Sequence, residues 1–343
     1  MTDFLAQFNA RLATYVAELE QMQTRNKREH AFSPTFWLEH ADFTLARDVF
    51  VAAGGSIGHE VTKFSLVYTS NKAPSQKEAS SICQAIDKPC EQLIAAAKVA
   101  LFCGAGPSLA NEIISDSLRL VKSVRDLGAS IEAGELTKVP ALTGRVWEYS
   151  VVARVSKSNC VATKRSMLQC ITMLNSTIEE LKEFLAEQED TPAEPLDAVE
   201  REDAFDDFDF DSSLSAEERV LFESGLKLLT MASAILKRGV LTLKKFTASN
   251  DDEAFLKWTA TLDLSYTAIQ DQIVDFGAAL YPPVGVDELS EAVEAIEKAG
   301  HAILTNLLAE PELTAKVTDE LHKGLAAFDQ QVATVKTQID ASR

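Results

Sequence analysis

The feature of this 343-residue sequence that most restricts its fold is the spacing of its large apolar residues. Through most of the chain they recur every three or four positions, the period of an α-helix with one buried face. No segment alternates for long with the period of two that marks a half-buried strand. The clearest run is Phe255, Trp258, Leu262, Tyr266, Ile269, Ile273, Phe276 and Leu280. The spacing therefore predicts an all-α protein.

Turn and capping residues predict where these helices begin and end. Ser33 with Pro34 is typical of a helix start, and Ser215 with Glu218 has the spacing of a capping box. Pro282 and Pro283 forbid continuation of the preceding helix. The segment "GAGPS" at 104–108 is expected to be an interhelical turn. We expect helices over 4–22, 33–69, 75–103, 109–131, 143–155, 159–186, 215–246, 255–280, 286–309 and 312–343.

Charge is distributed unevenly and indicates three regions. Residues 1–186 hold 20 acidic and 20 basic side chains, and residues 213–343 hold 20 and 12. Residues 187–212 hold 12 acidic side chains and a single basic one, within a net charge of −19 for the chain. Asp repeats disfavour helix and strand alike. We therefore predict antiparallel helical bundles at 1–186 and 213–343, joined by an acidic, flexible linker at 187–212. No large region has the basic excess that direct nucleic-acid binding requires.

Two interpretations of the acidic linker stay open. It is either a solvated tether or a docking strip, since alternating acidic and aromatic residues are typical of segments that bind basic grooves. Such a groove would belong to a partner or to a basic cluster of this chain. Thr191, which precedes a proline, is a candidate phosphorylation site. The candidate strip is Phe205, Asp206, Asp207, Phe208, Asp209 and Phe210, and the candidate basic groove is Arg154, Lys157, Lys164 and Arg165.

The sequence offers no candidate for catalysis, metal binding or a cofactor. No two helices have the Glu-x-x-His pattern of a di-iron bundle, and no paired Cys-x-x-Cys spacing indicates zinc. The turn at 104–108 has no Gly-Lys-Ser/Thr ending, so a phosphate loop is excluded. No apolar run approaches the length of a membrane span. The five cysteines are odd in number and lie in apolar helical runs, which indicates reduced thiols in the cytosol or nucleus. The three tryptophans are interpreted as core anchors.

Five segments in order resemble the cyclin-D-binding protein family, also called the GCIP family. They are "LTGRVWE" at 142–148, "SKSNCVATKRSMLQ" at 156–169, the Asp/Phe run at 205–211, "LSAEER" at 214–219 and "GAALYPPV" at 277–284. From the first to the last they span about 140 residues of the chain, and it is their order and spacing that make the resemblance specific.

The resemblance implies two antiparallel helical bundles similar to those of talin-like and vinculin-like proteins. It also implies a non-enzymatic regulator, present in cytoplasm and nucleus, that binds D-type cyclins and helix-loop-helix regulators and restrains cell-cycle progression and transcription. The alternative function is a talin/vinculin-like adaptor in cytoskeletal or signalling assemblies. No binding residue of the family is transferred, because the matched positions Gly144, Trp147, Tyr281, Pro282 and Pro283 are interpreted as structural.

Overall fold

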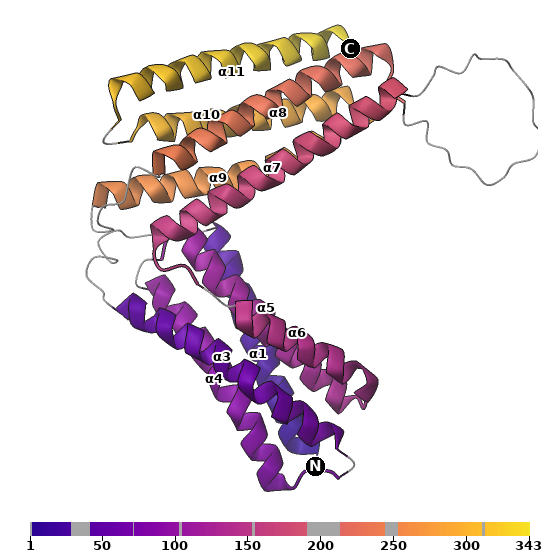
Figure 1. Ribbon diagram of the computed structural model, residues 1–343, viewed down its shortest axis with the longest axis vertical. Coiled ribbons are helices and arrows are strands. Elements are labelled where there is room, and N and C mark those ends of the chain that lie inside the picture. Colours follow the sequence, from indigo (N-terminus) through magenta and orange to yellow (C-terminus); the bar gives the residue numbers. More distant parts are fainter. Residues whose placement is uncertain are drawn as a thin grey trace, which may run out of the picture. The chain divides into compact units, whose positions relative to one another are not determined.

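A computed structural model describes residues 2–28, 42–70, 72–102, 105–152, 155–190, 213–243, 253–310 and 313–343 (Figure 1). Within these ranges every regular element is a helix and none is a strand, which confirms the predicted all-α class. The elements are α1 (Thr2–Arg28), α3 (Asp42–Thr69), α4 (Gln76–Phe102), α5 (Pro107–Glu132), the short 3-10 helix η1 (Leu136–Lys138), α6 (Val139–Val152), α7 (Asn159–Asp190), α8 (Ala216–Leu243), α9 (Glu253–Ala279), α10 (Val286–Leu308) and α11 (Ala315–Ala341).

The chain divides into two compact units, but at a different place from the predicted boundary. Unit 1 comprises residues 1–163 with 249–260, and unit 2 comprises residues 164–248 with 261–343. Most of α7 therefore belongs to unit 2, whereas the sequence placed residues 159–186 in the first bundle. The physical reason is the contacts of α7: the Ser233 hydroxyl of α8 donates to Asn175 of α7 at 3.0 Å, and Phe184 packs on Phe222.

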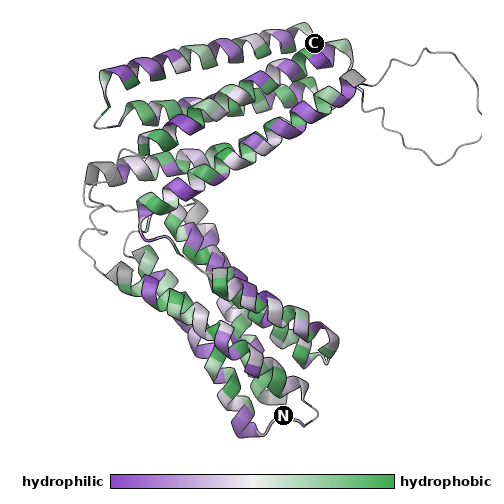
Figure 2. Cartoon of the chain, in the orientation of Figure 1, coloured by the Kyte–Doolittle hydropathy of each residue, from purple (hydrophilic) through white to green (hydrophobic). Residues whose placement is uncertain are grey.

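Unit 1 is built on antiparallel contacts between amphipathic helices. Asn9 of α1 bonds Glu132 of α5 at 2.6 Å, and at the opposite end Lys122 of α5 pairs with Glu20 of α1 at 2.6 Å. Helices α3, α4 and α6 complete the core. Figure 2 shows hydrophobic and hydrophilic residues alternating along these helices, as one buried face requires. The core includes Phe8, Leu12, Leu19, Ile57, Phe64, Ile86, Leu93, Val121 and Val146.

Of the turn predicted at 104–108, residues 105 and 106 precede α5, which begins at Pro107, and residue 104 lies outside the described residues. Pro107 occupies the first helical turn of α5, where its missing N–H is not needed. Gly106 precedes it as the N-cap residue, and its backbone N–H donates to the buried Asn159 Oδ1 at 2.6 Å. A Cβ here would lie 3.0 Å from the same oxygen, so a larger residue would require the Asn159 side chain to shift. The segment is thus a structural junction with the start of α7.

Unit 2 is organised around α8. The Gln331 amide of α11 donates to the Ser224 carbonyl of α8 at 2.9 Å, and Tyr266 of α9 donates its hydroxyl to the Leu236 carbonyl. Helices α10 and α11 lie side by side and antiparallel (Figure 1), since Lys336 pairs with Glu297 at 2.6 Å and Asp329 with His301 at 2.6 Å. The predicted stripe of α9 is confirmed as buried from Trp258 through Leu262, Tyr266, Ile269, Ile273, Phe276 and Leu280.

Two of the quoted motifs meet at the start of α8. The Ser215 backbone N–H donates to Glu218 at 3.0 Å, and the Glu218 N–H donates to the Ser215 hydroxyl at 3.2 Å, which confirms the predicted capping box. Glu218 also accepts the backbone N–H of Val284 at 2.9 Å. "LSAEER" and "GAALYPPV" are therefore one joint that closes an end of unit 2, and their role there is structural.

Acid is expected to weaken this joint. The backbone N–H of Val284, and then that of Ser215, hold the pKa of Glu218 below its ordinary value. Because the pKa is lower in the folded state, the ionised carboxylate contributes its full stability at pH values above the unfolded-state pKa of about 4.3. That contribution is lost as the pH falls through the folded-state pKa. Glu218→Gln should cost about 1–2 kcal/mol at pH 7 and progressively less below about pH 4.

Urea unfolding at several pH values measures this effect, and Glu217→Gln is the matched control because it removes the same charge from the exposed neighbouring residue. A Glu218→Gln cost that is the same at pH 7 and pH 3 would contradict the assignment.

Candidate protein-binding surfaces

The residues predicted as binding sites are only partly described. Thr191, Arg154 and the docking strip Phe205, Asp206, Asp207, Phe208, Asp209 and Phe210 lie outside the described residues, so their roles stay predictions. Lys157 is exposed in the loop before α7, and Lys164 and Arg165 follow within the first two turns of that helix. The basic groove as a whole therefore also stays a prediction.

Helices α3 and α6 pack closely and antiparallel in unit 1. Ser65 of α3 and Thr143 of α6 share a hydrogen bond at 2.6 Å. Seven residues away along both helices, a Cβ on Gly58 would lie 2.2 Å from the Ser150 Oγ. One flank of this contact line is the core, where Ile57, Val61, Phe64 and Val146 are buried. The other flank faces solvent.

Four exposed apolar residues lie on the solvent flank, and we call them, with Gly55 and Gly144, the Trp147 surface. Its α6 side has Trp147 at 53% and Val151 at 68% exposure, and its α3 side has Leu66 at 64% and Val51 at 40%. Gly55 and Gly144 add open space, since a Cβ on either would meet nothing within 4 Å. The interpretation of Trp147 as a core anchor is wrong, because the side of α6 that faces the core is instead filled by Val146. Exposed apolar residues that share one flank of a helix pair are candidates for a binding surface.

A groove opens in unit 2 between α8 and α11, with Leu304 of α10 contributing to its lining. We call it the α8–α11 groove, and its volume is about 250 Å³. Ile235, Leu304 and Leu321 are buried, and Ala234, Gly324 and Ala327 are small. Its lining is completed by Met231, Arg238 and Glu320. This groove was not predicted from the sequence, although Gly324 and Ala327 interrupt the large residues of an amphipathic stripe.

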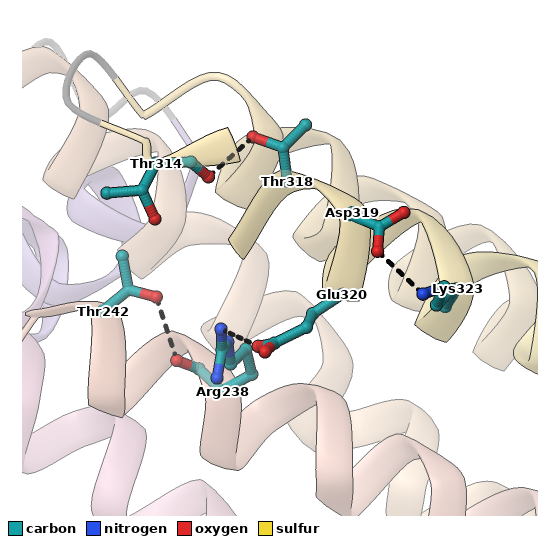
Figure 3. A network of polar contacts seen from close by, with 7 residues as sticks. All are labelled: Arg238, Thr242, Thr314, Thr318, Asp319, Glu320 and Lys323. Carbon is teal, nitrogen blue, oxygen red and sulfur yellow. Dashed lines mark hydrogen bonds and ion pairs between the residues drawn. The ribbon is translucent and has the colours of Figure 1, made fainter. Parts of the chain in front are cut away.

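A polar network borders one end of the groove (Figure 3). Arg238 of α8 reaches across to Glu320 of α11, with 2.5 Å between Nη2 and Oε2. Lys323 pairs with Asp319 at 2.7 Å, and the Thr242 and Thr318 hydroxyls donate to carbonyls one turn earlier. The two helices are thus held together at this end by an ion pair, while the lining beyond it is apolar.

Filling the space at Gly324 with one methyl group should stabilise the protein. A Cβ there would meet nothing within 4 Å, so alanine gains helix propensity without a clash. Gly324→Ala is expected to raise the free energy of unfolding by about 0.5–1 kcal/mol.

Chemical denaturation measures the change, and Gly300→Ala is the contrasting control. A Cβ on Gly300 would lie 2.6 Å from the Phe328 ring, so that variant should be less stable than the wild type. Equal effects of the two substitutions would contradict the open geometry at Gly324.

The buried thiols are poorly suited to nucleophilic chemistry. Cys83, Cys90 and Cys170 are buried and unbridged. Burial raises the pKa of Cys170 to about 12 and that of Cys90 still further, so both are protonated at neutral pH. The described residues contain no group of three or more His, Cys, Asp or Glu side chains that could hold a metal ion. In the same ranges, no helix is both long and apolar enough to cross a bilayer.

Comparison with known proteins identifies one region. Residues 50–187 match a family model described as Grap2 and cyclin-D-interacting, N-terminal. This span contains "LTGRVWE" and "SKSNCVATKRSMLQ", and it confirms the family resemblance predicted from the ordered motifs. No curated protein sequence matches the chain at a significant level. The matched range also contains every residue of the Trp147 surface.

Proposed function

We propose that the chain is a member of the Grap2 and cyclin-D-interacting family and a non-enzymatic regulator that acts by binding other proteins. Its partner is a D-type cyclin, and binding restrains cell-cycle progression and transcription. Helix-loop-helix regulators are further partners, the protein acts in both cytoplasm and nucleus, and it binds no nucleic acid directly. The observation that supports this function is the family match over residues 50–187.

The Trp147 surface is the proposed contact with the cyclin. Its residues lie within the matched range, and Trp147 lies in the quoted motif "LTGRVWE". Tryptophan is among the residue types most enriched at the positions that dominate binding energy in protein interfaces. Gly55 and Gly144 let the backbone of a partner approach both helices closely.

The test is direct binding of the purified protein to a D-type cyclin from its own organism. Wild type should bind, and Trp147→Ala should weaken binding about 30-fold, the equivalent of about 2 kcal/mol. Because Trp147 is half-exposed, its loss should leave the melting temperature nearly unchanged.

Val274→Ala is the matched control, since Val274 has a similar exposure of 54% on α9 in unit 2. A wild-type protein that binds no such cyclin would refute the function. Binding that survives Trp147→Ala unchanged would refute the surface and leave the function in place.

A further inference from the structure

We infer that the α8–α11 groove is a second docking site, and that its occupant is an acidic amphipathic helix of a partner protein. The inference does not depend on the proposed cyclin role, because the groove and the Trp147 surface belong to different units of the chain. It rests on the size, the shape and the charge of the groove.

The size of the groove suits side chains better than a cofactor. Pockets that enclose drug-sized ligands usually measure about 300 to 1,000 Å³. The α8–α11 groove, at about 250 Å³, is smaller and is partly open to solvent. Its lining offers Arg238 and Glu320 as charged groups, and these two side chains already pair with each other. The groove is therefore suited to one or two apolar side chains presented by a larger molecule.

The shape of the groove favours a helix as the element that presents these side chains. Ala234, Gly324 and Ala327 are small residues from both walls, so a third backbone can approach α8 and α11 closely. Beneath them, Ile235, Leu304 and Leu321 offer an apolar floor. A helix in such a groove inserts apolar residues spaced by three, four and seven positions, and its opposite face stays in water.

The charge around the groove selects an acidic helix. Five basic side chains and three carboxylates lie within one turn of the lining residues of α8 and α11. The surroundings of the groove are therefore net basic, whereas the whole protein has a net charge of −19. The five are Lys227, Lys237, Arg238, Lys316 and Lys323, and the three are Asp319, Glu320 and Asp329. Lys227 and Lys316 make no ion pair with another described residue. Each lies on the groove-facing stripe of its helix, four residues before Met231 and Glu320 respectively.

This local excess of basic charge gives the docking site its specificity. Glutamates flanking the apolar anchors of a partner helix would pair with Lys227 and Lys316, whereas lysines in the same places would be repelled. Since these pairs lie at the rim, they act chiefly on the association rate and on the choice of partner, and added salt weakens them.

The experiment uses the full chain and three labelled helical peptides with one apolar face in common. Each is about 18 residues long, since shorter helices are marginal in water, and presents leucines at i, i+3, i+4 and i+7. The remaining positions are mainly Glu, mainly Gln or mainly Lys. Fluorescence anisotropy should show the Glu peptide binding about tenfold or more tightly than the Lys peptide at low salt.

Three variants locate the binding. Gly324→Leu places a leucine into the groove and should weaken binding of the Glu peptide about tenfold or more. Ala333→Leu is the matched control, because it adds a leucine at an exposed position of the same helix that does not line the groove. Joint substitution of Lys227→Glu and Lys316→Glu should reverse the preference between the Glu and Lys peptides.

The inference would be overturned if no peptide binds, or if the Lys or Gln peptide binds as tightly as the Glu peptide. It would also be overturned if Gly324→Leu leaves binding of the Glu peptide unchanged, or if the joint substitution of Lys227 and Lys316 leaves the preference between the peptides unchanged. Self-association of the wild type that Gly324→Leu abolishes would assign the groove to a second copy of this chain and would also overturn it. If the protein binds a D-type cyclin but gives any of these results, the proposed function stands and the docking site in the groove is refuted. If it binds the Glu peptide as expected but binds no cyclin, the docking site stands and the proposed function is refuted.

Discussion

A fragment restricted to residues 50–187 is expected to be largely unfolded, although it spans the whole match to the family model. The fragment lacks α1, whose buried side chains Leu5, Phe8, Leu12, Val16 and Leu19 are part of the core of unit 1. Burial of each such side chain contributes about 1.5–3 kcal/mol. Their combined loss, about 10 kcal/mol, is comparable to the entire stability of a domain.

The other end of the fragment has the same defect. Residues 164–187 belong to unit 2, where Asn175 bonds Ser233 and Phe184 packs against Phe222 and Tyr281. Without α8 and α9, the apolar face of α7 is left exposed to water. A helix deprived of its packing surface is marginal even when its sequence favours helix.

Circular dichroism and thermal melting measure the outcome. The fragment should show low helicity and no cooperative transition, whereas a fragment of residues 1–163, which restores α1 and omits most of α7, should melt cooperatively. A cooperative transition of the 50–187 fragment, with the mean helicity of the full chain, would contradict this account.

The helices themselves could be predicted because each has its own apolar stripe. Phe8, Leu12 and Leu19 of α1 recur at the spacing of one helical face, and all three are fully buried. Local signals also fixed some ends, as Ser215 and Glu218 did for α8. Ends without such signals were less accurate: α6 begins at Val139 rather than near Thr143, and α11 begins at Ala315 rather than at residue 312.

The assignment of α7 to unit 2 could not be predicted, because an apolar stripe shows that a face is buried but not which helix buries it. The prediction that Trp147 lies in the core was wrong for a different reason. A large aromatic residue on a helix usually faces the core, but on α6 the neighbouring Val146 takes that position and leaves Trp147 on the flank.

The α8–α11 groove depends on residues far apart in the sequence. Met231 and Gly324 lie on different helices, and the pairing that brings them together is set by Gln331 with Ser224 and by Arg238 with Glu320. Neither contact has a local signature in the sequence. The small residues of α11 could have indicated a close approach or an open groove, and only the arrangement of the helices distinguishes these.

Replacing Phe328 with alanine is expected to cost about 3–5 kcal/mol, because this fully buried ring fills the space between α10 and α11 where Gly300 leaves room for it. Gly300→Leu alone should cost about 1–3 kcal/mol, since its side chain would overlap the ring. In the double variant with Phe328→Ala, the leucine occupies the space that the ring has vacated. The double variant should therefore lose less free energy of unfolding than the two single variants lose in total. Urea denaturation of the four proteins gives the coupling energy between the two sites. Additive losses would show that the Phe328 ring does not occupy the space above Gly300, and the packing assigned to this pair of helices would then be wrong.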